Sequence, residues 1–161
     1  MSRRTNSKRK FPIPDPVYNS YLVSLLTVRI LKSGKKTLAQ KIIKKTFNRI
    51  KERTNKNPMK VFERAVQNVR PRVEVKATRV GSSTYQVPID VSNFRSTNLS
   101  LRWIVKFARK RSGRAFAIKL ANELIESSKG FGNAIRKKEE THRMAKANKA
   151  FTYLKSRFNS R

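Results

Sequence analysis

The apolar residues in the first part of the chain recur every three or four positions, a spacing that places them on one face of a helix. The first two predicted helices carry Leu22, Leu25, Leu26 and Ile30 within residues 20–31, and Ala39, Ile43, Phe47 and Ile50 after a stop at Ser33-Gly34. A third opens at Asn57-Pro58, where Asn57 is the expected N-cap, and ends at Arg70-Pro71. We therefore expect three helices before residue 72.

Between residues 72 and 91 the period changes to two. Apolar and polar residues alternate on both sides of a short turn expected at residues 81–84, which predicts a β-hairpin, and Pro88 indicates an edge strand. We expect the odd-numbered apolar residues to hold the hairpin together or against the helices, while the even-numbered residues and the tip face outward. These odd-numbered residues are Val73, Val75, Tyr85, Val87 and Ile89.

Helical spacing returns near Asn98 and continues in three further segments. Their expected apolar positions are Trp103, Ile104, Phe107 and Ala108 before Gly113, and then Ala117, Leu120, Ala121, Leu124 and Ser128 before a break at Gly130-Phe131-Gly132. The last helix, from about Asn133 into the 150s, has few apolar residues and two possible ion pairs, Arg136–Glu140 and Glu139–Arg143. The predicted fold is mainly α, a six-helix bundle with a β-hairpin inserted between helices 3 and 4.

Charge then indicates what this fold binds. The chain has 40 Lys and Arg against 9 Asp and Glu, a formal net charge of +31. A compact domain so charged repels itself unless a polyanion neutralises it, and nucleic acid does so while releasing its counterions. Because basic residues occur on almost every predicted element, folded RNA is favoured over a DNA groove, which usually meets one recognition element. No apolar run approaches the roughly 18 residues of a membrane-spanning helix, so no membrane partner is predicted.

The expected organisation is one domain with two basic ends. Residues 1–18 form a flexible basic N-terminal arm, residues 19–152 a single helical RNA-binding domain with its hairpin at 72–91, and residues 153–161 a basic C-terminal tail. The arm is kept extended by its prolines. Its start carries no apolar segment, so no secretory signal is predicted.

Groups that could support catalysis or hold a metal are few. The chain has no cysteine, which excludes disulfides, zinc fingers and thiol catalysis. His142, the one histidine, is expected at the surface or facing RNA. The two aspartates, Asp15 and Asp90, belong to the arm and the hairpin, so a catalytic triad is not expected. Glu123 and Glu126 share a helix face, but two glutamates are no metal cluster. We predict no catalytic residue, metal, cofactor or small-molecule substrate, and no enzyme activity.

Several strings occur in one order along nearly the whole chain. They are Asp15-Pro16-Val17-Tyr18, Ile30-Leu31-Lys32-Ser33-Gly34-Lys35-Lys36, Asn68-Val69-Arg70-Pro71-Arg72-Val73-Glu74-Val75-Lys76, Arg79-Val80-Gly81-Ser82-Ser83-Thr84-Tyr85-Gln86-Val87-Pro88, Leu101-Arg102-Trp103-Ile104, Ala121-Asn122-Glu123-Leu124, and the run from Ala134 to Phe151. Together they resemble the universal small-subunit ribosomal protein seven family. The resemblance implies six helices with a β-ribbon after the third.

The resemblance also implies a function. It implies primary binding to the 3′ major domain of small-subunit ribosomal RNA, nucleation of head assembly, contacts with neighbouring small-subunit ribosomal proteins, and a hairpin that reaches exit-site tRNA and mRNA. With the basic stripes, it gives the residues expected to contact RNA: Arg3, Arg4, Lys8, Arg9, Lys10, Lys35, Lys36, Arg72, Lys76, Arg79, Tyr85, Arg95, Arg102, Arg109, Lys110, Arg111, Arg114, Arg136, Lys137, Arg143 and Lys146. Ser82 and Lys146 depart from the family pattern, where a second turn glycine and a glutamate are usual.

The lysine richness and the string ending His142-Arg143-Met144-Ala145 resemble the plastid branch of the family most. A plastid (chloroplast) ribosome is therefore the expected location, with the bacterial cytoplasm or a mitochondrion as alternatives.

Two other classes of protein stay open. An architectural, histone-like DNA-binding protein is expected to show one dominant wedge or recognition helix. A nuclease would need a convergent cluster of carboxylates or histidines. Among the aromatic residues, Trp103 and Phe107 are expected in the core, whereas Tyr85 beside the turn could either pack or stack on a base.

Overall fold

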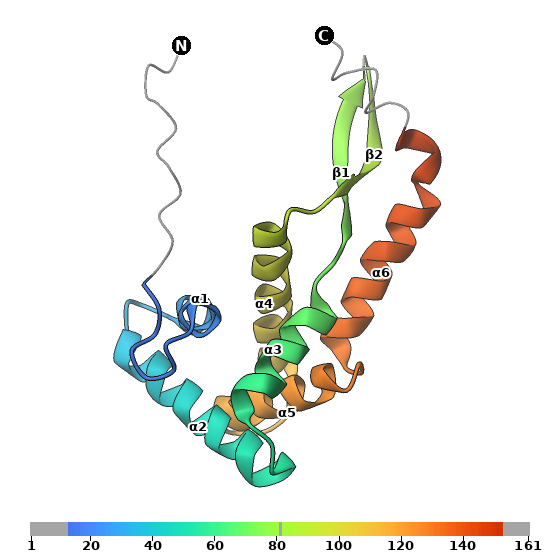
Figure 1. The fold of residues 1–161 in the computed structure, drawn as a ribbon. Helices are drawn as coiled ribbons and strands as arrows, with labels where there is room; N and C mark the ends of the chain where they lie inside the picture. The colour runs from blue at the N-terminus through green and yellow to red at the C-terminus, as the bar shows by residue number, and fades with distance from the viewer. Residues whose placement is uncertain (1–12, 81, 153–161) are drawn as a thin grey trace, which may run out of the picture.

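The computed structural model describes residues 13–80 and 82–152, and the mainly α fold with a hairpin after the third helix is confirmed (Figure 1). Its elements are α1 (Tyr21–Ile30), α2 (Lys36–Thr54), α3 (Pro58–Val69), β1 (Val73–Val80), β2 (Ser83–Asp90), α4 (Asn93–Lys110), α5 (Phe116–Ser128), α6 (Asn133–Ala147) and a 3₁₀ turn, η1 (Lys149–Thr152). The basic segments before residue 13 and after residue 152 lie outside the described residues.

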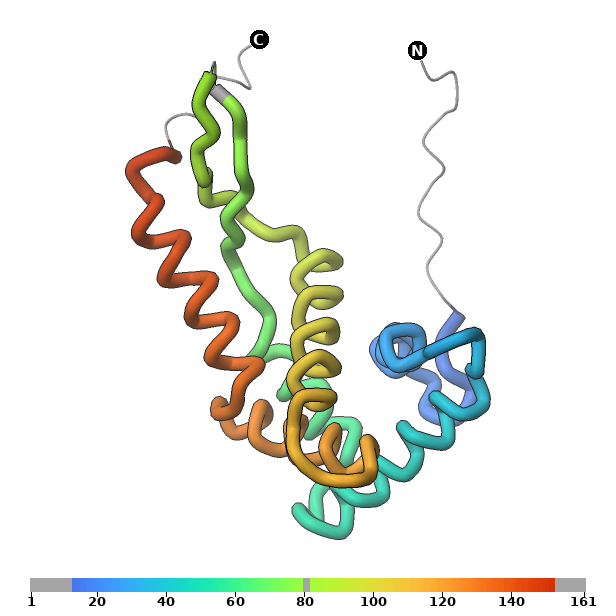
Figure 2. Tube along the Cα trace, turned by 180° about the vertical axis from the view of Figure 1, so that it is seen from behind, coloured from blue at the N-terminus to red at the C-terminus, as the bar shows by residue number. Residues whose placement is uncertain are grey.

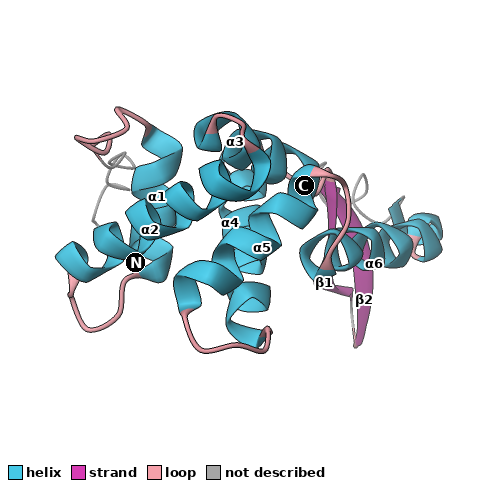
Figure 3. Ribbon diagram, turned by 90° about the horizontal axis from the view of Figure 1, so that it is seen from below, coloured by secondary structure: helices cyan, strands magenta, loops and turns pink. Residues whose placement is uncertain are grey.

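The core lies where α5 packs against α2, α3 and α4. Viewed from below, α3, α4 and α5 lie in the middle, α1 and α2 on one side, and α6 with the hairpin on the other (Figure 3). Phe47 of α2 packs against Phe62 of α3, with ring centres 5.8 Å apart. Tyr18 approaches the same Phe47 edge-on at 4.9 Å, so the residues before α1 take part in the core.

Those residues are held by a carboxylate. The side chain of Asp15, 7% exposed, accepts hydrogen bonds from the backbone N–H groups of Val17 (3.2 Å) and Tyr18 (3.4 Å). A short aspartate bonded to the backbone two and three residues on is a common way to stabilise a turn. The end of the predicted arm is thus folded against the domain.

Two helices differ in detail from the prediction. In α1, Val23 is buried and Leu22 only half-buried, so the apolar face is rotated. The fourth helix begins at Asn93, five residues before the expected start, because its first turns are polar and carry no apolar period. Ser96 in this part is buried, and its hydroxyl donates to the carbonyl of Pro71 at 2.7 Å. The buried face continues through Leu101 and Val105, while Trp103 and Phe107 are half-buried at the edge of the core.

The hairpin turn is tighter than expected, because β2 already begins at Ser83, opposite Val80. The odd-numbered apolar residues are all buried or half-buried, and Lys76 and Ser82 are exposed, but the odd-numbered residues do not all lie on one face of the ribbon. Val75 lies opposite Pro88 and Lys76 opposite Val87, so an odd position in one strand faces an even position in the other. Since directly opposite residues share a face, the apolar residues of β1 and β2 lie on opposite faces of the ribbon.

The hairpin runs beside α6, and the two project together beyond the other helices (Figures 1 and 2). Helix α6 contacts β1, and η1 contacts β2. The ring of Tyr85 packs against Phe151 of η1 at 5.4 Å, and Val87 is only 2% exposed. A two-stranded ribbon that is marginal alone is therefore supported along its length.

Two phenylalanines, one buried in the core and one exposed, allow the packing of the core to be tested. We expect Phe62→Ala, at a fully buried position, to lower the free energy of unfolding by about 3–5 kcal/mol through lost burial and a residual cavity. Phe131→Ala, at a side chain 71% exposed, should change it by no more than about 0.5 kcal/mol. Urea unfolding followed by circular dichroism measures both, and equal losses would contradict the packing described here.

Candidate nucleic-acid interface

A cleft of about 570 Å³ lies beside the turn between α1 and α2. Ser33 and Gly34 both have positive φ (52° and 71°), which reverses the chain and places Lys32 and Lys35 on the cleft. Arg109, near the end of α4, lines it from the opposite side. We call this the turn cleft; its other lining residues are Ile30, Ser33, Leu38, Ala39, Ile42 and Phe116.

The turn cleft brings together cations that lie far apart in the sequence. A guanidinium N–H of Arg109 reaches the carbonyl of Ile30 at 3.5 Å, which orients the side chain across the cleft. No lining residue is acidic, so Lys32, Lys35 and Arg109 create an uncompensated positive potential. Such a site attracts phosphate, and its apolar wall can accept a ribose or a base. Lys32 was not among the predicted RNA contacts, since only packing brings it beside Arg109.

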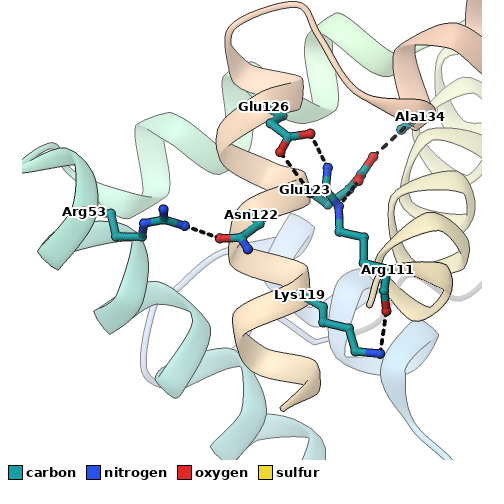
Figure 4. A network of polar contacts seen from close by, with 7 residues as sticks. All are labelled: Arg53, Arg111, Lys119, Asn122, Glu123, Glu126 and Ala134. Carbon is teal, nitrogen blue, oxygen red and sulfur yellow. Dashed lines mark hydrogen bonds and ion pairs between the residues drawn. The ribbon is translucent and has the colours of Figure 1, made fainter. Parts of the chain in front are cut away.

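Unlike Arg109, Arg111 does not line the turn cleft. Its guanidinium is bonded to two glutamates of α5 (Figure 4). Its Nε donates to Glu123 at 2.6 Å, and its terminal nitrogens donate to both oxygens of Glu126, one of them at 2.8 Å. The Glu123 side chain is fully buried, and its second oxygen accepts the backbone N–H of Ala134 at 3.2 Å. This cluster joins the loop after α4, the middle of α5 and the start of α6.

The cluster also accounts for the pKa shifts nearby. The hydrogen bond from Arg111 lowers the pKa of Glu126, against the opposing effect of partial burial. The bond to Glu126 likewise raises the pKa of Arg111. Arg111 and Glu126 are therefore charged, and Arg111, a predicted RNA contact, has its charge satisfied within the fold.

Two more predicted RNA contacts hold carboxylates. Arg95 of α4 binds Glu74 of β1 through two hydrogen bonds of 2.6 and 3.0 Å, which fastens the ribbon to the helix. In α6, Lys137 pairs with Glu140 at 2.9 Å, three residues on. This pair takes the place of the expected Arg136–Glu140 pair within the described part of the helix.

The ribbon and α6 enclose a second hollow, of about 440 Å³. We call it the ribbon groove; it is lined by Arg72, Val73, Pro88, Ile89, Asp90, His142, Ala145, Lys146, Lys149 and Thr152. His142 is half-buried there, and its Nε2 accepts the backbone N–H of Arg72 at 3.1 Å. His142 thus lines a groove at the surface, and its bond to the ribbon is a contact that the sequence pattern did not indicate. Burial, with the charges of Lys138 and Arg72, lowers the pKa of His142.

The remaining predicted cations are placed as follows. Exposed side chains are those of Lys36, Arg72, Lys76, Arg79, Arg102, Lys110, Arg114, Arg136, Arg143 and Lys146. Five others, Arg3, Arg4, Lys8, Arg9 and Lys10, lie outside the described residues. Over residues 13–80 and 82–152, no three carboxylate and histidine side chains gather closely enough to hold a metal ion. In the same residues, no helix is both long and apolar enough to cross a membrane.

A model of the family described as ribosomal protein S7p/S5e matches residues 1–149. The chain belongs to this family. The small ribosomal subunit protein uS7c of Trieres chinensis is 62% identical over 144 residues, 89% of this chain and 91% of that protein. The uS7 proteins of Gloeothece citriformis and Thermosynechococcus vestitus are 54% and 50% identical over 155 residues, in each case 96% of this chain and 99% of the relative.

Family membership decides several expectations at once. The S7 chain is a structural component of the small ribosomal subunit and not an enzyme, and it acts in translation as part of a ribonucleoprotein. The expected plastid location is confirmed, since the relatives include a plastid protein together with cyanobacterial ones.

The buried cluster around Arg111 can be tested by removing one carboxylate. In this S7 chain we expect Glu123→Ala to lower the free energy of unfolding by on the order of 3 kcal/mol, because Arg111 loses a partner inside the protein. Glu140→Ala removes an exposed pair and should cost no more than about 1 kcal/mol. Chemical denaturation of both variants measures the difference; a Glu123 variant as stable as the Glu140 variant would refute the fastening role.

The bond to His142 predicts a pH dependence. The acceptor nitrogen must be unprotonated, and the pKa of His142 is lowered in the fold, so its contribution to stability is complete above the ordinary histidine pKa of about 6.5. That contribution is lost as the pH falls below this value. His142→Gln keeps an acceptor that cannot titrate, and should lose less stability between pH 7.5 and 5. Urea midpoints of the two proteins at both pH values provide the comparison, and parallel losses would count against the bond.

Proposed function

We propose that this protein is a primary binder of the 3′ major domain of small-subunit ribosomal RNA, and that its binding nucleates assembly of the head. The observation that carries the proposal is the turn cleft, where Lys32, Lys35 and Arg109 converge without an acidic neighbour. Phosphate oxygens are the ligands that such a cluster of cations attracts. Lys36 and Lys110, exposed next to two of these residues in the chain, extend the positive surface.

The turn cleft exists only in the folded domain, which suits a protein that recognises RNA shape. Lys35 and Arg109 are brought together by the packing of α1 against α2 and α4. RNA that fills the cleft therefore binds the folded state and stabilises it by mass action. The net charge of +31, which weakens the isolated fold, becomes favourable in the complex.

We assign the hairpin a separate task, contact with exit-site tRNA and mRNA. The ribbon and α6 project away from α1 and the start of α2 (Figures 1 and 2). Lys76 and Arg79 are exposed on the ribbon. Tyr85 packs against Phe151, so its ring supports the ribbon. Because the ribbon is fastened through Arg95 and His142, it can present its tip at a fixed place.

The structure does not favour the alternative of an architectural DNA-binding protein. Exposed cations lie on α2, α3, α4, α6 and the ribbon, and they do not concentrate on one recognition helix. A folded RNA with several helices meets such a distribution better than one groove of DNA.

Two variants separate the proposed tasks. Lys35→Gln, Lys36→Gln, Arg109→Gln and Lys110→Gln together should weaken binding to the 3′ major domain and reduce incorporation into subunits. Each lost phosphate contact should lower the slope of log affinity against log salt by about one unit. Arg111 is left in place because its loss would damage the fold. Filter binding at several salt concentrations and sedimentation of reconstituted subunits measure these effects.

The second variant shortens the hairpin while keeping its register. Residues 79–84 are replaced by Asn-Gly, which suits a two-residue turn between Thr78 and Tyr85, already paired across the strands. We expect near-normal incorporation but impaired tRNA retention or reading-frame maintenance, followed with a frameshift reporter. If this variant fails to enter subunits as completely as the first, the proposed division of tasks is incorrect.

A further inference from the structure

A third hollow, of about 850 Å³, lies at the corner where α2 gives way to α3, beside the end of α5. None of its lining residues is acidic, and five are cationic: Arg53, Lys56, Lys60, Arg64 and Lys129. We call this the corner cleft. Neither the sequence pattern nor the family resemblance indicated these five residues, since they come from three elements that only the fold brings together.

Local structure holds this charge in place. Helix α2 ends at Asn55 in the left-handed conformation (φ 50°), and Asn57 caps α3 by accepting the N–H of Met59 at 2.9 Å. The connection is therefore short, and Lys56 is confined between two helix ends. Arg53 is oriented by a hydrogen bond from its guanidinium to the side-chain oxygen of Asn122 on α5 (Figure 4).

The corner cleft has an electrostatic cost in the free protein. Lys60 and Arg64 lie four residues apart on α3, a spacing at which like charges destabilise a helix. Two nearby carboxylates are bonded to other arginines, Glu52 to Arg49 at 3.0 Å and Glu126 to Arg111, although the charge of Arg53 also acts on Glu126. A third, Glu63 of α3, does not line the cleft. An anion from outside would remove this repulsion, and the N-terminus of α3 would add to its attraction.

We infer that the corner cleft binds the sugar–phosphate backbone of a second RNA segment, distinct from the segment at the turn cleft. This inference rests on the proposed function and extends it. The turn cleft lies at the start of α2 and the corner cleft at its end, and 19 helical residues span about 28 Å. One nucleotide cannot reach both clefts, so α2 acts as a spacer between two stretches of backbone.

The chemistry of the corner cleft favours RNA over a protein partner. Two of its ten lining residues, Val61 and Ile125, have hydrophobic side chains, and Val61 is only 7% exposed, so the cleft offers little to the hydrophobic anchors typical of protein interfaces. Val61 and Ile125 can still contact a ribose while the surrounding cations bind phosphates.

The absence of cysteine from the chain permits a direct test in assembled subunits. Single variants Lys129→Cys and Lys35→Cys, each at an exposed position, are labelled with an iron chelate that releases hydroxyl radicals, and RNA cleavage is mapped. We expect cuts from position 129 in a segment different from the one cut from position 35. Cuts in the same segment, or none from position 129, would overturn the inference.

A charge-matched pair of variants tests the energetics. Lys56→Gln, Lys60→Gln and Lys129→Gln should lower the salt slope for the complete 3′ major domain by about three units. The control, Lys45→Gln, Lys51→Gln and Lys106→Gln, removes the same charge from exposed positions outside the corner cleft and should lower the slope by less than about one unit. Equal losses would show an effect of net charge alone and overturn the inference.

Two outcomes distinguish this inference from the proposed function. RNA cleavage from position 129 without RNA cleavage from position 35 would refute RNA binding at the turn cleft and leave the corner cleft supported. Cross-linking of position 129 to an acidic segment of a neighbouring ribosomal protein, without RNA cleavage, would refute the corner cleft as an RNA site.

Discussion

The scarcity of negative charge is the constraint on which this structure depends. All nine acidic residues lie in the described part of the chain, and five of them (Glu52, Glu74, Glu123, Glu126 and Glu140) form ion pairs with lysine or arginine. Asp15 holds the turn before α1. Three of these carboxylates, Glu74, Glu123 and Glu126, join separate segments of the fold. The few acidic residues leave large basic surfaces without internal compensation. The protein thus keeps enough negative charge to organise its own fold and relies on a polyanion for the rest.

Much of the fold could be predicted from local pattern, and the failures have a common cause. The period of the apolar residues located α2, α3 and α5, and the capping residue Asn57 marked the start of α3. The start of α4 was missed because Ser96 is buried through a bond to Pro71, a tertiary contact with no local signature. Sequence alternation also could not assign the faces of the hairpin, because a register is a relation between two strands.

In the candidate interface, too, local sequence predicts some features and long-range packing decides others. Basic residues were easy to find, but their roles depend on neighbours distant in the sequence. Arg109 lines a cleft, whereas Arg111, two positions on, binds two glutamates inside the fold. No property of either residue alone separates the two roles. Lys32 was likewise passed over, although it shares a cleft with Arg109.

The offset pairing of the ribbon has a consequence for how its length can vary. Val75 and Val87 lie on opposite faces because residue numbers across the strands sum to an odd value. One extra residue in a single strand would force a bulge or slip the register, and a slip would turn every side chain of that strand over. Lengthening that preserves both faces therefore adds residues to the two strands in equal number. The ribbon can grow or shrink only in steps of matched pairs, which limits how finely its reach can be adjusted.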